Sequence, residues 1–194
     1  MTETQIFEPD GRAIPYAAEG EGPALVLVPG RASDIAMLGS LAHSVSQEDF
    51  RVVRIGLRAA ADDTDAVAPS FRDFAQDIVD VMDHLGIDDA WVGGHAFGGS
   101  IARRVSLDHH ARVNGVLLLG VESADMAPPL ADGLPVLVVQ GTDDDVTPPL
   151  NGETLQATAP SLVSVVPIEG GGHLFPQTHV GATSWAIEDY LDWD

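Results

Sequence analysis

The chain changes from an apolar run to a helical pattern within the stretch Trp91-Val92-Gly93-Gly94-His95-Ala96-Phe97-Gly98-Gly99-Ser100-Ile101-Ala102. Gly94 and Gly98 stand two residues before and two residues after Ala96. Glycines at this spacing remove side chains at the point where a strand and the following helix would crowd each other. The stretch therefore predicts a sharp strand-to-helix turn, with unusual backbone angles at residue 96.

Short apolar runs recur on both sides of this turn. They are rich in β-branched residues and are bounded by glycine or proline, which is typical of buried parallel strands. Pro167 places the last of them at the edge of a sheet or at a strand end. Residues 14–17 predict an antiparallel edge strand before the first parallel one. We expect parallel strands over residues 24–28, 51–55, 90–93, 113–119, 135–140 and 164–168.

Helical patterns lie between these runs. The clearest covers residues 69–85, where apolar side chains from Phe71 to Leu85 fall on one face at three- and four-residue steps. Ser70 can cap its start and Gly86 can end it. Strands that alternate with helices predict an α/β fold with a mostly parallel central sheet flanked by helices. Further helices are expected over residues 35–47, 97–109, 151–159 and 179–191.

The composition is that of a globular protein. Of the 194 residues, 45% are hydrophobic and 20% are charged, which fits one domain over residues 1–194. No apolar run reaches the roughly 18 residues of a membrane helix, so no membrane span is expected. The chain has no cysteine, which excludes disulfides, thiol catalysis and cysteine metal ligands. The first residues do not form a secretory signal, and we therefore expect a cytoplasmic protein.

The charge is strongly one-sided. Nine basic residues, all arginine, face 30 acidic residues, for a net charge of −21. A polyanion would be repelled, so nucleic acid is not an expected partner. If the helix layer is thin, it leaves an apolar face that a second copy of the chain could cover. A homodimer is therefore one possible assembly.

Three motifs follow one another in an order that belongs to a known family. Gly94-His95-Ala96-Phe97-Gly98 resembles the nucleophile elbow of the α/β-hydrolase family, Gly-x-Ser-x-Gly, with alanine in place of serine. Gln140-Gly141-Thr142-Asp143-Asp144-Asp145-Val146-Thr147-Pro148 resembles the loop that carries the acid in this family. Glu169-Gly170-Gly171-Gly172-His173 resembles the loop that carries the catalytic histidine. The order nucleophile, acid, histidine is that of the family.

The acid is assigned by its spacing. The loop resembles Gly-x-x-Asp-x-x-x-Pro, which selects Asp144 between Gly141 and Pro148. Asp143 and Asp145 are neighbours that make this assignment a choice.

A fourth motif resembles the oxyanion loop of the family. It is Val28-Pro29-Gly30-Arg31, with Pro29 in place of the usual histidine. The resemblance implies that the backbone N–H groups of Arg31 and Phe97 form the oxyanion hole. The residues that it places near a substrate are Gly30, Arg31, His95 and Ser123.

The resemblance implies a serine hydrolase of a carboxylic ester, thioester or lactone, acting on a small molecule without metal or cofactor. A serine hydroxyl needs a base to remove its proton, and that base would be His173. Asp144 would orient the imidazole ring and stabilise its protonated form. Ala96 has no hydroxyl to deprotonate, so the chain as given is expected to lack acyl transfer through residue 96.

The resemblance also implies a site without a cap. Many members insert a cap domain where this chain has only residues 122–134, a segment too short for a helical cap. The segment at 58–68 is rich in alanine and aspartate and reads as a surface loop. The site is therefore expected to be open, or covered by loops alone.

Three interpretations of Ala96 stay open. It could replace serine deliberately, to trap a substrate in an otherwise complete site. The chain could be a natural relative that binds a ligand, or signals, without hydrolysis. It could also be an enzyme of other chemistry that uses His173 and Asp144 as a general base alone.

Other side chains have weaker assignments. Ser100 and Ser123 are the nearest serines to the turn, but neither occupies the bend that the mechanism uses. The side chain of Arg31 would either hold a carboxylate or other polar group of the substrate, or pair with Asp34 or the acidic residues at 62–65.

Overall fold

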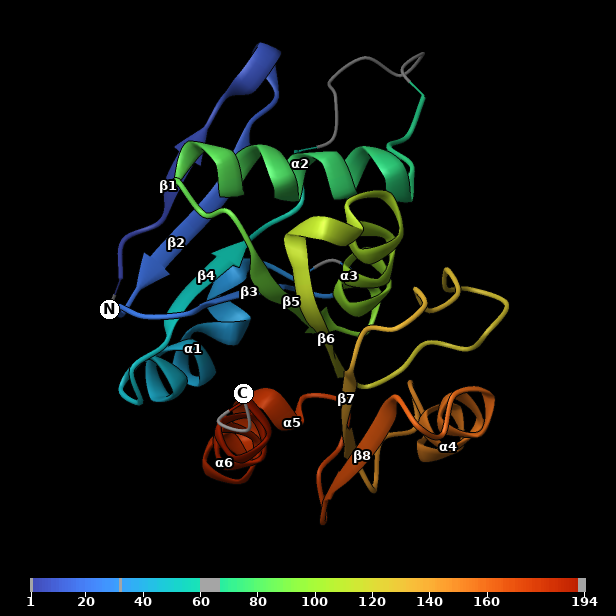
Figure 1. Cartoon of the computed structure of the whole chain (residues 1–194). Coiled ribbons are helices and arrows are strands. Elements are labelled where there is room, and N and C mark those ends of the chain that lie inside the picture. The colour runs from blue at the N-terminus through green and yellow to red at the C-terminus, as the bar shows by residue number, and fades with distance from the viewer. Residues whose placement is uncertain (1, 32, 60–66, 192–194) are drawn as a thin grey trace.

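The computed structural model describes residues 2–31, 33–59 and 67–191, which form an eight-stranded sheet between two layers of helices (Figure 1). The strand order is β1-β2-β4-β3-β5-β6-β7-β8. β1 pairs antiparallel with β2, β2 pairs antiparallel with β4, and all other pairs are parallel. The strands are β1 Gln5–Phe7, β2 Ile14–Glu19, β3 Ala24–Val28, β4 Arg51–Ile55, β5 Ala90–His95, β6 Val113–Leu119, β7 Val136–Gly141 and β8 Val163–Ile168.

Helices cover both faces of the sheet. On one face lie α2 Phe71–His84, α3 Phe97–Asp108 and α4 Pro149–Thr158. On the other lie α1 Gly39–Ser46, α5 Phe175–Thr178 and α6 Val180–Leu191. Short 3-10 helices cover Pro9–Gly11 (η1), Ile35–Leu38 (η2) and His110–Arg112 (η3). Among the described residues no helix is both long and apolar enough to cross a membrane. The expected fold, a mostly parallel sheet flanked by helices, is confirmed.

The central strand β3 is apolar throughout because both of its faces are covered. Val26 and Val28 of β3 pack in the core beneath α2 and α3, whereas Leu25 and Leu27 pack in the core beneath α1 and α6. All four side chains are fully buried. A strand buried on both faces needs a continuous apolar run instead of an alternating one.

The predicted strands are present, with one correction of position. β2 is antiparallel, as expected, but the prediction that it forms the edge is wrong. Gln5 of β1 pairs with Tyr16 of β2, so β1 lies outside it. At the other end of the sheet β8 is the edge strand and contains Pro167, as predicted.

The predicted helices are also present to within a few residues. α2 begins with a capping box, in which Ser70 Oγ accepts from Asp73 N–H and the Asp73 carboxylate accepts from Ser70 N–H. Gly86 follows its end with φ of 67°. Of the expected loop at 58–68, residues 60–66 lie outside the described residues.

The carboxyl ends of the parallel strands gather the loops that carry the motifs. Residues 120–135, between β6 and β7, contain no helix or strand. The fold therefore has no cap domain at this position, as the sequence predicts.

Candidate active site

Residue 96 occupies the turn between β5 and α3 in a strained conformation. Its φ is 49° and its ψ is −109°, which is unusual for a residue with a side chain. A Cβ atom on Gly98 would lie 2.1 Å from the carbonyl oxygen of Val28, and one on Gly94 would lie 2.5 Å from that same oxygen. Side chains at either position would push α3 away from β3, so the tight turn requires glycine at both.

The backbone N–H groups that have no acceptor in the part of the chain that the structure describes include two that flank this turn. These belong to Phe97, the first residue of α3, and to Arg31, three residues beyond the end of β3. The first N–H groups of a helix lack partners within the helix. Both residues line the same cavity as Ala96. They are the donors that the oxyanion-loop resemblance selects.

Asp144 and His173 are in contact. His173 Nδ1 lies 3.1 Å from each carboxylate oxygen of Asp144, whose side chain is 0% exposed. The N–H groups of Val146 and Thr147 donate to Asp144 Oδ1, each at 2.9 Å. The hydroxyl of Thr147 donates to Oδ2 at 2.6 Å. These bonds hold the carboxylate still beneath the imidazole ring.

The protonation states follow from these contacts. Burial acts to raise the pKa of Asp144, but hydrogen bonds from Thr147, His173 and Val146 outweigh it, and the pKa is lower than usual. An ionised carboxylate only accepts hydrogen bonds, so Nδ1 of His173 carries the proton. In the neutral ring Nε2 then has a free lone pair. His173 is thus in the tautomer of a general base, with a side chain 24% exposed.

His95 lies beneath His173 instead of facing solvent. The residue is 2% exposed, and its Nε2 donates to the backbone carbonyl of His173 at 2.8 Å. The ring centroids of the two histidines are 4.5 Å apart. Burial lowers the pKa of His95 to about 4, so the ring is neutral at neutral pH. His95 therefore anchors the loop that carries His173.

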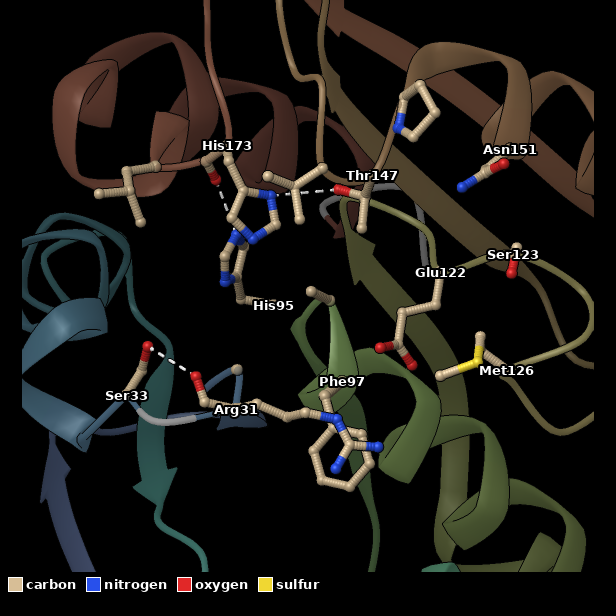
Figure 2. A pocket seen from close by; sticks show the side chains of 15 residues that line it. Arg31, Ser33, His95, Phe97, Glu122, Ser123, Met126, Thr147, Asn151 and His173 are labelled. Carbon is tan, nitrogen blue, oxygen red and sulfur yellow. Dashed lines mark hydrogen bonds between the residues drawn. The ribbon is translucent and has the colours of Figure 1, made fainter.

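A cavity of about 590 Å³ opens above these groups (Figure 2). It contains Ala96 and His173 from the motifs, together with all four residues expected near a substrate. Three apolar side chains of its lining, Met126, Val146 and Leu174, are exposed at 55%, 63% and 47%. Such exposure agrees with the absence of a cap.

The side chain of Arg31 stacks on an aromatic ring. Its guanidinium carbon lies 3.7 Å from the ring centroid of Phe97. Among the described residues no ion pair joins it to Asp34, whose carboxylate caps η2 by accepting from Ala36 N–H at 2.8 Å. The alternative partners at 62–65 lie outside the described residues.

The two spare serines differ in their surroundings. Ser100 is 2% exposed, and its hydroxyl donates to Glu122 Oε2 at 2.6 Å. Ser123 lines the cavity. Neither stands at the bend between β5 and α3.

Sequence reasoning missed four polar residues of this site. The cavity is lined by Ser33, Glu122, Thr147 and Asn151, none of which a motif singles out. Thr147 follows Asp144 by three residues, a spacing at which a hydroxyl can bond a carboxylate in a turn. Glu122 follows a parallel strand at its carboxyl end, where binding groups gather. No group of three or more His, Asp or Glu residues in the described ranges is placed to hold a metal ion.

Comparison with known proteins identifies a family and curated relatives. The profile of the family described as alpha/beta hydrolase fold matches residues 23–134. A zearalenone hydrolase from Bionectria ochroleuca is 26% identical over 121 residues, which are 60% of this chain and 46% of that protein. The chain therefore matches about half the length of this relative.

Solved structures agree with the fold along almost the whole chain. A thermophilic esterase from Thermogutta terrifontis superposes with a TM-score of 0.84 at 17% identity, covering 98% of both chains. An epoxide hydrolase from Vigna radiata superposes with a TM-score of 0.81 at 14% identity, again covering 98% of both chains. A serine-to-alanine mutant of a meta-cleavage product hydrolase from Pseudomonas fluorescens gives 0.81 at 15%, over 97% of both. At such identities the likeness concerns the fold alone.

Proposed function

Because this chain belongs to the alpha/beta hydrolase fold family, we propose that it is a serine-type hydrolase of a carboxylic ester, thioester or lactone. Ala96 stands at its nucleophile position and supplies no nucleophilic oxygen, so we expect no acyl transfer there. The observation that carries the proposal is the contact of Asp144 with His173, which lines the same cavity as the strained residue 96. A site with no use for a base would not need to keep this pair.

With serine at position 96, His173 Nε2 would remove the hydroxyl proton as the oxygen attacks the substrate carbonyl. The carbonyl oxygen would become an oxyanion bound by the N–H groups of Arg31 and Phe97. His173 would then protonate the leaving alcohol or thiol, and water would hydrolyse the acyl-enzyme by the same steps. Asp144 would keep the imidazolium oriented throughout.

The test is to assay the chain and its Ala96→Ser variant on p-nitrophenyl esters from acetate to decanoate. We expect the variant to exceed the chain by roughly 10⁴-fold or more in kcat/KM, because the missing oxygen is the nucleophile. Ala36→Ser, a change at an exposed position outside the cavity, is the control and should give no gain. A folded Ala96→Ser variant without gain on any of these esters would contradict the proposal.

The role of Asp144 has its own test in the Ala96→Ser background. Asp144→Asn should lower kcat by about 10⁴-fold, since the amide no longer selects the required tautomer of His173. Asp143→Asn and Asp145→Asn alter exposed neighbours and should stay within a few-fold. Equal losses in all three variants would contradict the assignment.

A second candidate function rests on Ala96 itself. A methyl group in place of the nucleophile leaves a cavity that can bind a ligand without cleaving it, as a sensing or carrier protein would. Chemistry that uses the His173–Asp144 pair as a general base without serine belongs to the same alternative. Ligand binding by the chain, with no hydrolysis after Ala96→Ser, would favour this candidate.

A further inference from the structure

Glu122 is a carboxylate of the cavity that the proposed mechanism does not use. It follows β6 and lines the same cavity as Arg31 and Phe97 (Figure 2). The side-chain contacts of His173 Nδ1 go to Asp144 and Thr147, so Glu122 does not orient the base. Its presence in the cavity therefore needs another explanation.

One oxygen of this carboxylate is fixed and the other is free. Oε2 accepts a hydrogen bond of 2.6 Å from the hydroxyl of Ser100, a residue that is 2% exposed and lies one turn after Ala96 on α3. Oε1 has no hydrogen bond to any residue in the described part of the chain. The carboxylate is thus held in place and retains one acceptor.

A buried cation lies behind Glu122. Arg103 is 5% exposed and lines a second cavity of about 120 Å³, which shares Glu122 and Asn151 with the first. Its guanidinium forms no hydrogen bond or direct ion pair within the described residues. Burial lowers the pKa of Arg103 to about 10, while Glu122 acts to raise it, so Arg103 remains charged at neutral pH.

These charges decide which group fits at the free oxygen. Arg103 already balances the charge of Glu122 at a distance, so a second cation is not required there. An alkyl group would displace water from Oε1 and replace none of its hydrogen bonds. An uncharged donor would supply a hydrogen bond to an anchored carboxylate, which is stronger than one between neutral groups.

We infer that Glu122 is a specificity-determining residue whose free oxygen accepts a hydrogen bond from a hydroxyl group of the substrate. The preferred esters are therefore hydroxylated ones. The inference rests on the proposed function. It follows the general rule that a site built to bond a substrate hydroxyl discriminates against the analogue that lacks it.

The test uses the chain as given, because Ala96 leaves bound esters intact. Titration calorimetry would measure the Kd of propyl butyrate, 2,3-dihydroxypropyl butyrate and propyl 3-hydroxybutyrate. The first ester has no hydroxyl group, the second has two in its alcohol part, and the third has one in its acyl part. We expect at least one hydroxylated ester to bind roughly 10-fold or more tightly than propyl butyrate. In Glu122→Leu the ratio of the two Kd values should fall close to one. Propyl butyrate should bind this variant at least as tightly as it binds the unchanged chain.

Two further variants complete the design. Glu48→Leu removes one exposed carboxylate outside both cavities and should leave the preference unchanged. Glu122→Gln keeps the shape of the side chain and should give an intermediate preference, which serves if Glu122→Leu does not fold. Equal binding of the three esters by the chain, or equal losses for all three in the Glu122 variants, would overturn the inference.

The outcome is separable from that of the proposed function. Hydrolysis of p-nitrophenyl butyrate by Ala96→Ser reports on the nucleophile and needs no hydroxyl group. Hydrolysis without hydroxyl preference would overturn the inference about Glu122 alone. The other outcome is that binding prefers hydroxylated esters through Glu122 but Ala96→Ser hydrolyses no ester. This would support the inference about Glu122 and contradict the proposed hydrolase function.

Discussion

The backbone at residue 96 is strained although its side chain is only a methyl group. Positive φ at a non-glycine residue costs about 1–3 kcal/mol, and such strain persists only where the surroundings impose it. Here the surroundings are β5 on one side and α3 on the other, with Gly94 and Gly98 allowing their close approach. The strain would present a side chain at this position to His173, which is what a nucleophile requires.

The burial of His95 predicts that the free energy of unfolding depends on pH. The pKa of His95 is about 4 in the folded chain and near 6.5 when unfolded, so the unfolded chain binds the proton more tightly. The stability that neutral His95 provides is complete above pH 6.5 and is lost as pH falls toward 4. Between pH 7.5 and 4.5 this loss is about 2 kcal/mol.

Urea unfolding of the chain and of His95→Gln at these two pH values measures the effect. The variant keeps a donor for the His173 carbonyl but cannot take up a proton. Between pH 7.5 and 4.5, the free energy of unfolding of the variant should therefore fall by about 2 kcal/mol less than that of the chain. His110→Gln changes an exposed histidine whose ring contacts the backbone carbonyl of Asp132 at 2.9 Å, and it should behave like the chain. If the chain and His95→Gln have the same pH dependence, the account of His95 is wrong.

At the scale of elements, the sequence predicts strands and helices well where burial leaves a pattern. β3 to β8 are apolar runs because both faces of the sheet are covered, and α2 has a capped start and an apolar face. β1 escapes prediction because its three residues pair through the backbone and bury no side chain fully. α5 has four residues, too few to show a helical period.

The sequence predicts those residues of the site whose positions follow from the spacing within a motif. The motifs select Ala96, Asp144 and His173, and the structure brings Ala96 and His173 to one cavity and Asp144 into contact with His173. Contacts between separate segments, such as that from Ser100 to Glu122, depend on how α3 lies against the end of β6. No pattern within one segment can express such a contact.

The packing of α3 against β3 gives a prediction for Gly98→Ala. The added methyl carbon would meet the carbonyl oxygens of Val28 and Pro29 at 2.1 and 2.5 Å, so the helix or the loop must move. We expect a loss of about 2 kcal/mol or more in the free energy of unfolding, measured in urea. In the Ala96→Ser background the hydrolytic rate should fall as well, because Phe97 N–H moves with the helix.

Gly181→Ala is the matched control. Gly181 lies near the start of α6, where an added Cβ would meet nothing within 4 Å. Alanine there should leave stability unchanged or raise it by up to about 1 kcal/mol. Similar losses in the two variants would show that the close approach of α3 and β3 is not what requires Gly98.

At the scale of the whole molecule, acidic charge dominates. Asp77 is buried and bound by Arg12 and Arg58, but nine arginines cannot balance 30 carboxylates. The net charge of −21 must repel itself most strongly in the compact state. Salt shortens the range of this repulsion, from about 30 Å at 0.01 M to about 10 Å at 0.1 M.

We therefore expect the melting temperature to rise by several degrees as NaCl increases from about 0.01 M to 0.5 M. Calorimetric scans at fixed pH would measure it. Sodium perchlorate at the lower concentrations is the control, since screening depends on ionic strength and not on the anion. A melting temperature that falls with both salts would mean that local ion pairs outweigh the net repulsion.

We propose residue 96 as the nucleophile position of a serine-hydrolase site that keeps its base, His173, and its acid, Asp144. The most direct measurement is intact-protein mass spectrometry of Ala96→Ser after treatment with a fluorophosphonate, followed by peptide mapping. We predict one adduct per chain, located at residue 96, which is absent from the chain as given and strongly slowed by adding His173→Ala. A folded Ala96→Ser variant that gains no adduct, or gains it at another residue, would contradict the claim.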